Sequence, residues 1–129
     1  MNKEKISKVG IALIEHFLAT GETITYSELC DLVDFKVCPI RIGAHLGYIS
    51  QMCIDRDLPI ITALVVKKGE RVCSDSFFKC YFPEVKDKES FLIEYYETIK
   101  KCPEWEFLLI ELKKSLKMFE NKNFDPLFI

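Results

Sequence analysis

One stretch of this chain, residues 24–82, limits its possible folds more than any other. Thr25-Tyr26-Ser27-Glu28 has the pattern of a capping box, in which the Thr25 hydroxyl accepts from the Glu28 amide and the Glu28 carboxylate accepts from the Thr25 amide. The box predicts the start of a short helix. After a turn at residues 34–37, Pro39 suits the first position of a second helix, which is expected to run to about Asp55.

The residues after this second helix predict a small β-hairpin. Residues 60–66 are rich in β-branched side chains, which is typical of a strand. A turn is expected at residues 67–70, because Gly69 can adopt the left-handed backbone conformation without strain. Residues 71–73 are expected to pair back, and residues 77–82 are a further extended candidate, which Pro83 ends.

Amphipathic helices are expected on both sides of this stretch. Residues 3–19 place apolar side chains at helical spacing, and Gly21 suits the end of that helix. Two more helices are expected, one after Asp87 and one after Pro103. The inward stripe of the last helix is predicted to be Trp105, Leu109, Leu112, Leu116 and Phe119.

Helix, turn, helix and wing, in that order, are the layout of a winged helix-turn-helix. We therefore predict an α+β fold with a winged helix-turn-helix-like core, made of three helices and a small β-hairpin, in residues 1–83. Residues 84–129 are predicted to form a C-terminal helical extension of two helices, packed on the same core. This scaffold most often lays its second reading helix on nucleic acid.

The reading helix of such a core would be the one that starts at Pro39. Its predicted buried stripe is Ile42, Leu46, Ile49 and Cys53, which leaves Arg41, His45 and Tyr48 together on another face. These three side chains are the first candidates for contact with DNA.

Two glycines, Gly43 and Gly47, lie within this helix, where each costs roughly 1 kcal/mol relative to alanine. The pair therefore needs a structural reason. Close packing of another element against the bare backbone is expected, with close approach to a ligand or phosphate as the alternative.

The charge balance points in two directions. The chain has 18 Lys and Arg against 20 Asp and Glu, a net charge of −2, which counts against strong unspecific binding to a polyanion. Residues 67–82 reverse this balance, because only Glu70 and Asp75 oppose a larger basic set there. That set is Lys67, Lys68, Arg71 and Lys79, and Lys67, Lys68 and Arg71 are predicted to touch phosphates as part of a wing.

Two phrases resemble the DNA-binding domain of the O6-alkylguanine-DNA alkyltransferases and the alkyltransferase-like proteins. Ile24-Thr25-Tyr26-Ser27-Glu28-Leu29 resembles that family's "VTYGELA", and Arg41-Ile42-Gly43-Ala44-His45-Leu46 resembles its "RAVGRAL" recognition helix. The match covers residues 24–66. It implies DNA binding, with Arg41 in the position of the arginine that takes the place of a flipped base.

The family's acceptor cysteine is missing here. Where the family has Pro-Cys-His-Arg-Val-Val, this chain reads Leu58-Pro59-Ile60-Ile61-Thr62-Ala63-Leu64-Val65-Val66, with neither cysteine nor histidine. Alkyl transfer needs an activated thiolate, so that activity is rejected. No other catalytic motif is present, and the protein is expected not to be an enzyme.

Six cysteines and two histidines offer no pair with the close spacing of zinc ligands. Neither a metal nor another cofactor is therefore expected, and the cysteines are expected to be free thiols. No apolar run reaches the length of a membrane span, and the charged start lacks a signal peptide, so a cytoplasmic location without membrane contact is expected.

Two functions stay open. The first is a DNA-binding protein, either a small regulator or an alkyltransferase-like sensor. The alternative is a protein-interaction module, such as an inhibitor of a host defence enzyme encoded by a phage or mobile element, with Tyr95, Tyr96 and Trp105 as interface anchors. Exposed aromatic residues on the last two helices could equally form the seam of a homodimer.

Overall fold

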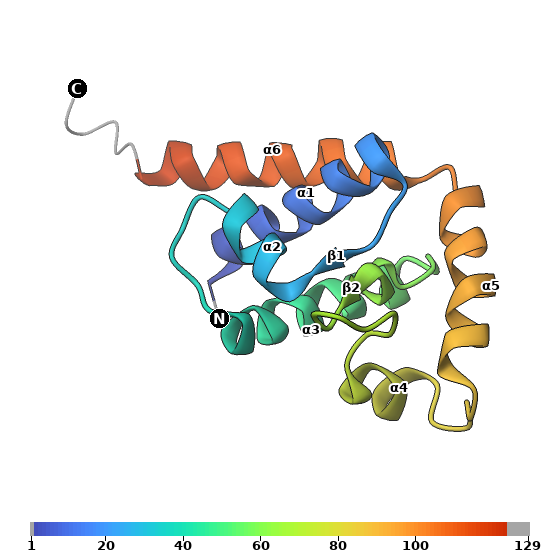
Figure 1. Ribbon diagram of the computed structural model, residues 1–129. Coiled ribbons are helices and arrows are strands. Elements are labelled where there is room, and N and C mark those ends of the chain that lie inside the picture. The colour runs from blue at the N-terminus through green and yellow to red at the C-terminus, as the bar shows by residue number, and fades with distance from the viewer. Residues whose placement is uncertain (1, 124–129) are drawn as a thin grey trace.

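A computed structural model describes residues 2–123 of the chain, with side chains to residue 118. The elements are α1 (Lys3–Thr20), β1 (Ile24–Thr25), α2 (Tyr26–Leu32), α3 (Pro39–Asp55), the 3-10 helix η1 (Ile61–Leu64), β2 (Val65–Val66), α4 (Asp75–Tyr81), α5 (Lys88–Lys101) and α6 (Trp105–Asn123). Figure 1 shows α6 lying along α1, with α3 on the other side of α1 and α5 standing across the end.

The predicted winged helix-turn-helix fold is wrong. The described residues form a mostly helical fold, and their strands, β1 and β2, make a two-stranded parallel sheet in place of a hairpin. Ile24 pairs with Val65 and Thr25 with Val66, so the valines of the expected strand pair with the residues before α2. Most of the rest of that expected strand, residues 61–64, forms η1.

The further extended candidate at residues 77–82 is also wrong, since residues 75–81 form helix α4. The reason lies in the spacing of the aromatic residues. Phe77 and Phe78 are buried, and Phe77 packs edge-on against Tyr81 one turn later, with ring centroids 5.4 Å apart. Asp75 in the first turn favours the helix start electrostatically. The periodicity of these aromatic residues is helical, and this outweighs their intrinsic preference for strands.

The turn predicted at residues 67–70 is present. Gly69 has φ 77°, the Glu70 amide donates to the Lys67 carbonyl at 3.0 Å, and the Lys67 amide donates to the Val72 carbonyl at 3.2 Å. The turn thus closes on itself locally, and no paired strand follows it among the residues described.

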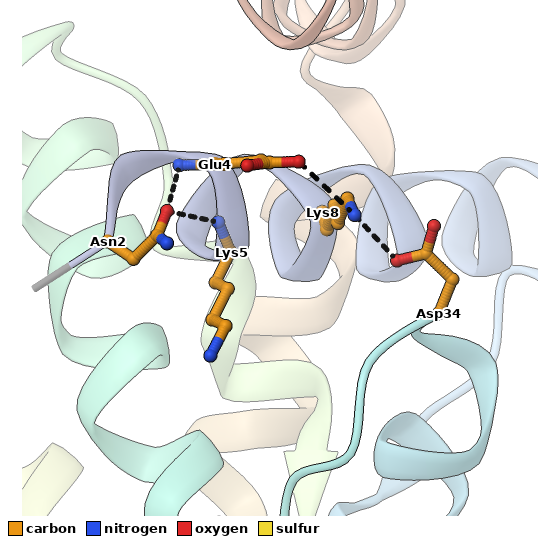
Figure 2. Close-up of polar contacts among 5 residues, drawn as sticks. All are labelled: Asn2, Glu4, Lys5, Lys8 and Asp34. Carbon is orange, nitrogen blue, oxygen red and sulfur yellow. Dashed lines mark hydrogen bonds and ion pairs between the residues drawn. The ribbon is translucent and has the colours of Figure 1, made fainter. Parts of the chain in front are cut away.

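The helix at the N-terminus is confirmed, and its ends are capped. Asn2 Oδ1 accepts from the amides of Glu4 and Lys5, at 2.8 and 3.3 Å, and Gly21 ends the helix with φ 67°. Lys8 joins α1 to the loop after α2 through an ion pair with Asp34 at 3.0 Å (Figure 2). The hydrogen bond to Asp34 is the main cause that raises the pKa of Lys8.

The capping box is confirmed at the start of α2. The Glu28 amide donates to Thr25 Oγ1 at 3.2 Å, and the Thr25 amide donates to Glu28 Oε1 at 3.0 Å. Thr25 belongs to β1, so the last residue of the short strand also caps the helix. Leu29 is buried, whereas Leu32 is exposed.

The core lies where α1 meets α3 and α6. A methyl group added at Gly10 would stand 3.0 Å from Leu112 Cδ1, so α6 approaches α1 closely at this glycine. Trp105 is 2% exposed, packs edge-on against Phe17 and donates from its indole N–H to the Ile99 carbonyl at 2.8 Å. Burying such a side chain stabilises the fold by about 1.5–3 kcal/mol or more.

The two helices after residue 87 are confirmed, with α6 starting two residues beyond Pro103. Of the stripe predicted for α6, Trp105 and Leu112 are buried, Leu109 and Leu116 are partly buried, and Leu108 joins them unpredicted. The side chain of Phe119 and the tail at residues 124–129 lie outside the described part of the chain. None of the described helices combines the length and apolar character needed to cross a membrane.

Candidate nucleic-acid interface

The three residues of helix α3 that were predicted to contact DNA differ in their exposure to solvent. Arg41 and Tyr48 are exposed, whereas His45 is only 8% exposed and turns inward. The His45 ring nitrogen Nδ1 is 3.2 Å from the Arg41 carbonyl oxygen, and its ring packs against Phe35 with centroids 5.8 Å apart. His45 therefore supports α3, and the exposed pair for contact with a partner is Arg41 and Tyr48.

A row of contacts connects this side of α3 with the start of α1. The Lys5 ammonium lies 5.4 Å from the centroid of the Phe35 ring, and Phe35 packs on His45, one turn after Arg41. In Figure 2 the Lys5 side chain points away from Glu4 and Asp34. A cation of α1 is thereby held beside α3 by an aromatic ring, without an acidic partner.

Two more cations border the same side. Lys36 is exposed next to Phe35, and Lys3 shares a surface depression with Tyr48, Met52 and the acidic Glu111 of α6. We name Lys3, Lys5, Lys36 and Arg41 the basic edge. Within the described residues, none of the four forms an ion pair, and residues 35–54 contain no Asp or Glu. Sequence reasoning missed this cluster because Lys3 and Lys5 are far from α3 in the chain.

The N-terminus of α3 lies in the same region. Pro39 occupies the first helical position, Cys38 provides no capping side-chain hydrogen bond, and the first turn has no acidic residue. The positive end of the helix dipole is thus not neutralised by the helix's own side chains, and this adds to the local positive potential.

The cations predicted for a wing have different surroundings. Lys67 pairs with Glu70 and Asp75 at 3.7 and 3.8 Å, while Lys68 is exposed. Arg71 lines a depression together with Glu70, Glu89 and Tyr96, on the side of α5. The structure therefore does not bring these three residues together with the basic edge, and acidic side chains lie beside two of them.

The C-terminal aromatic residues turn toward the core. The Ile60 amide donates to the Tyr95 hydroxyl at 2.6 Å, and the Tyr96 hydroxyl donates to the Ala63 carbonyl at 3.2 Å. Burial raises the pKa of both, that of Tyr96 to about 12. Together with the buried Trp105, they hold α5 and α6 against η1 and the core. The exposed apolar residues of these helices are others, namely Ile93 of α5 and Phe107, Ile110 and Met118 of α6.

Two of the six cysteines are poorly suited to nucleophilic chemistry. Cys53 and Cys73 are buried, and burial raises the pKa of both thiols, that of Cys73 to about 12. A thiol with a raised pKa stays protonated at neutral pH and is a poor nucleophile. In the described part of the chain, no three His, Cys, Asp or Glu side chains group as metal ligands do.

The glycine pair of α3 faces open space. A methyl group added at Gly43 or Gly47 would meet no heavy atom within 4 Å, so the expectation of close packing is wrong. The glycines instead line a groove of about 420 Å³ between α3 and α4. No charged side chain lines this groove, whose walls include Tyr26, Phe77 and Tyr81.

Comparison of the chain with protein-family models, with curated proteins and with solved structures finds no match in any of the three.

Proposed function

We propose that this protein is a non-enzymatic DNA-binding protein that uses the exposed side of α3 and the basic edge beside it. The described fold has no wing, to which the phosphate contacts were assigned from the sequence. This proposal assigns those contacts to Lys3, Lys5 and Lys36 instead. Arg41 and Tyr48 are the side chains that would enter a groove of the duplex.

The observation that supports this proposal best is the row of contacts Lys5–Phe35–His45–Arg41. It holds the Lys5 ammonium of α1 on Phe35, which packs on His45 one turn after Arg41, beside a stretch that has no acidic residue from position 35 to position 54. Phosphate backbones bind such clusters by counterion release, even where the net charge of the whole chain is slightly negative.

Each group has a distinct role in this account. The lysines and the uncapped N-terminus of α3 would hold phosphates, which fixes the position of the protein without reading sequence. Arg41 can offer two parallel donors to a guanine edge, or stack against a base, and Tyr48 can stack on an unpaired base. A sensor of unusual DNA structure and a small regulator would both use these groups.

Fluorescence anisotropy with labelled single- and double-stranded DNA tests the proposal. Three phosphate contacts predict that the affinity falls about 40-fold when the salt concentration rises from about 50 to about 200 mM. Absence of binding at the lower salt concentration would refute the proposal. Binding that does not respond to salt would do the same, since it could not come from phosphate contacts.

Variants locate the interface. Lys5→Ala and Lys36→Ala should each reduce the slope of log affinity against log salt by about 1. Lys101→Ala is the matched control, because Lys101 is an exposed lysine on α5, away from α3. Arg41→Lys keeps the charge and should keep the salt slope, but it should lose affinity if the planar guanidinium contacts a base. An equal effect of Lys101→Ala would show that the binding is unspecific.

The second candidate function is protein interaction, favoured by one observation on α6. Phe107 is 70% exposed and Ile110 lies one turn further along the same side. Phe107 and Ile110 take the role of interface anchors in this candidate function, because the predicted anchors Tyr95, Tyr96 and Trp105 pack against the core. If the partner is a protein, Phe107→Ala should weaken its capture while Lys5→Ala leaves it unchanged, and DNA titrations should show no salt-sensitive binding.

A further inference from the structure

The side of α3 that carries Gly43 and Gly47 has a pattern of residues that reads the same from either end of the helix. Ile40, Gly47 and Ile54 follow at intervals of seven residues, so they form one stripe along the helix, about 10 Å apart. Ile40 is 91% exposed and Ile54 is 42% exposed, which is unusual for large apolar side chains that the fold could have buried. The stripe thus has an apolar knob at each end and bare backbone in the middle.

This stripe has no neighbour over its glycines, and α4 borders it on one side, where Ile40, Gly43 and Gly47 line the groove described above. Gly43 and Gly47 have no neighbour within 4 Å of where their side chains would start, and neither has a positive φ that would require glycine. The two glycines reduce the helical stability of α3 by about 1 kcal/mol each. The fold gains no described contact in return, so the glycines point to close approach of another chain, since small residues at the contact let helices approach.

We infer that a second copy of this chain docks on the stripe, with the two α3 helices crossing in antiparallel orientation at Gly47. A two-fold axis through Gly47 places Ile40 of one copy against Ile54 of the other, and it does so at both ends. The middle of the contact, where the helices lie closest, is then glycine against glycine. The inference does not depend on DNA binding.

The charges beside the stripe favour a second copy of this chain as the partner, and they favour the antiparallel orientation of its α3. The stripe itself has no charged residue, and Arg41 and Asp55 lie on the same flank of α3, near opposite ends. Antiparallel docking brings Arg41 of each copy toward Asp55 of the other, whereas a parallel two-fold pair would put these flanks on opposite sides of the contact and leave both charges unpaired. Neither side chain forms an ion pair with another described residue, although the Gln51 amide donates to Asp55 Oδ1 at 2.8 Å.

Sedimentation equilibrium tests the inference on the full chain, from about 1 µM to about 1 mM, a range that covers weak and moderate affinities. The mass should rise with concentration toward twice the 15.0 kDa of the chain. A mass that stays at 15.0 kDa up to the highest concentration overturns the inference. Ile40→Glu should raise the Kd of the dimer at least about tenfold, because it places a carboxylate at an apolar contact twice per dimer.

The matched control is Ile93→Glu, which makes the same change at an exposed isoleucine on α5, 67% exposed and away from the stripe. It should leave the Kd unchanged, and an equal loss in both variants would place the seam elsewhere. Circular dichroism should show that both variants fold, and Ile54→Glu repeats the test at the other knob. An effect of Ile93→Glu alone would also overturn the inference.

A charge exchange tests the direction. Arg41→Glu and Asp55→Lys should each weaken the dimer, and the double variant should restore it, because antiparallel copies again oppose unlike charges. Failure of the double variant to recover overturns the antiparallel arrangement. Arg41 is also assigned to DNA, so Lys5→Ala serves the DNA test and Ile40→Glu the dimer test. The two proposals can therefore fail separately.

Discussion

Helices α1 and α3 both carry glycines within a long helix, but the surroundings of these glycines differ. Gly10 of α1 lies under α6, where an added methyl group would stand 3.0 Å from Leu112 Cδ1 and 3.7 Å from Ile49 Cδ1. Gly43 and Gly47 of α3 face open space. We call the first region the closed interface and the second the open face of α3.

The difference separates two reasons for a glycine in a helix. At the closed interface the fold itself explains the residue, because Leu112 fills the space that a side chain would need. At the open face the fold supplies no such contact within the described residues, so the explanation lies in something that approaches from outside. Substitutions should therefore lower stability at the closed interface and raise it at the open face.

The largest expected effect is at the closed interface. Trp105→Ala should lower the free energy of unfolding by about 3–5 kcal/mol, because it removes a buried ring from its contact with Phe17 and leaves the Ile99 carbonyl with the Cys102 amide as its remaining donor. Urea unfolding followed by circular dichroism measures this. Phe107→Ala, two residues along the same helix but exposed, should change stability by less than about 0.5 kcal/mol. A similar loss in both variants would contradict the assignment of the two sides of α6.

A substitution at Gly10 tests the close approach directly. Gly10→Val should lower the free energy of unfolding by about 1–3 kcal/mol, because the branched side chain overlaps with Leu112 and Ile49. Adding Leu112→Ala should recover part of this loss, since the smaller side chain makes room, and a double-mutant cycle measures the coupling. Strict additivity of the two losses would show that α1 and α6 do not touch at this point.

Local signals in the sequence predicted much of the helical structure. The capping box at Thr25, Pro39 at the start of α3 and Gly21 at the end of α1 act through neighbours in the chain, and all three appear where predicted. The buried stripe of α3, Ile42 to Cys53, also followed from periodicity. These features need no information about distant residues.

The features that failed depend on distant partners. Val65 and Val66 have strand propensity, but their sequence does not say that they pair in parallel with residues 24 and 25. From the sequence, Tyr95 and Tyr96 resemble interface anchors, whereas in the fold their hydroxyls bond to the backbone of Ile60 and Ala63. Lys5 reaches the side of α3 only through Phe35, which packs on His45. Such contacts join segments far apart in the chain, which a single sequence does not specify.

Alkaline pH should lower the free energy of unfolding, because it weakens the contact between α5 and η1. The folded state raises the pKa of Tyr96 to about 12, first by burial, whereas an unfolded tyrosine titrates near pH 10. The contribution is therefore complete below about pH 10 and is lost as the pH rises toward 12, because the unfolded state releases its proton first. Unfolding curves at several pH values should show this decline.

Tyr96→Phe separates the titration from the hydrogen bond. It should lower stability at neutral pH by about 1 kcal/mol through loss of the bond to Ala63, and it should flatten the alkaline decline. Part of the decline should remain, because the pKa of the buried Cys73 thiol is also raised to about 12. An unchanged slope in Tyr96→Phe would contradict the role given to this hydroxyl.

The smallest expected effect has the opposite sign and lies on the open face of α3. Gly43→Ala and Gly47→Ala should each raise the free energy of unfolding by about 0.5–1 kcal/mol, because alanine favours the helix and its methyl group meets nothing within 4 Å. The measurement is best made in the Ile40→Glu background, where association cannot add to stability. With Ile40 intact, Gly47→Ala should weaken the dimer while still stabilising the monomer. A loss of monomer stability would show that α3 is closed at this point, and the contrast with Gly10 would then disappear.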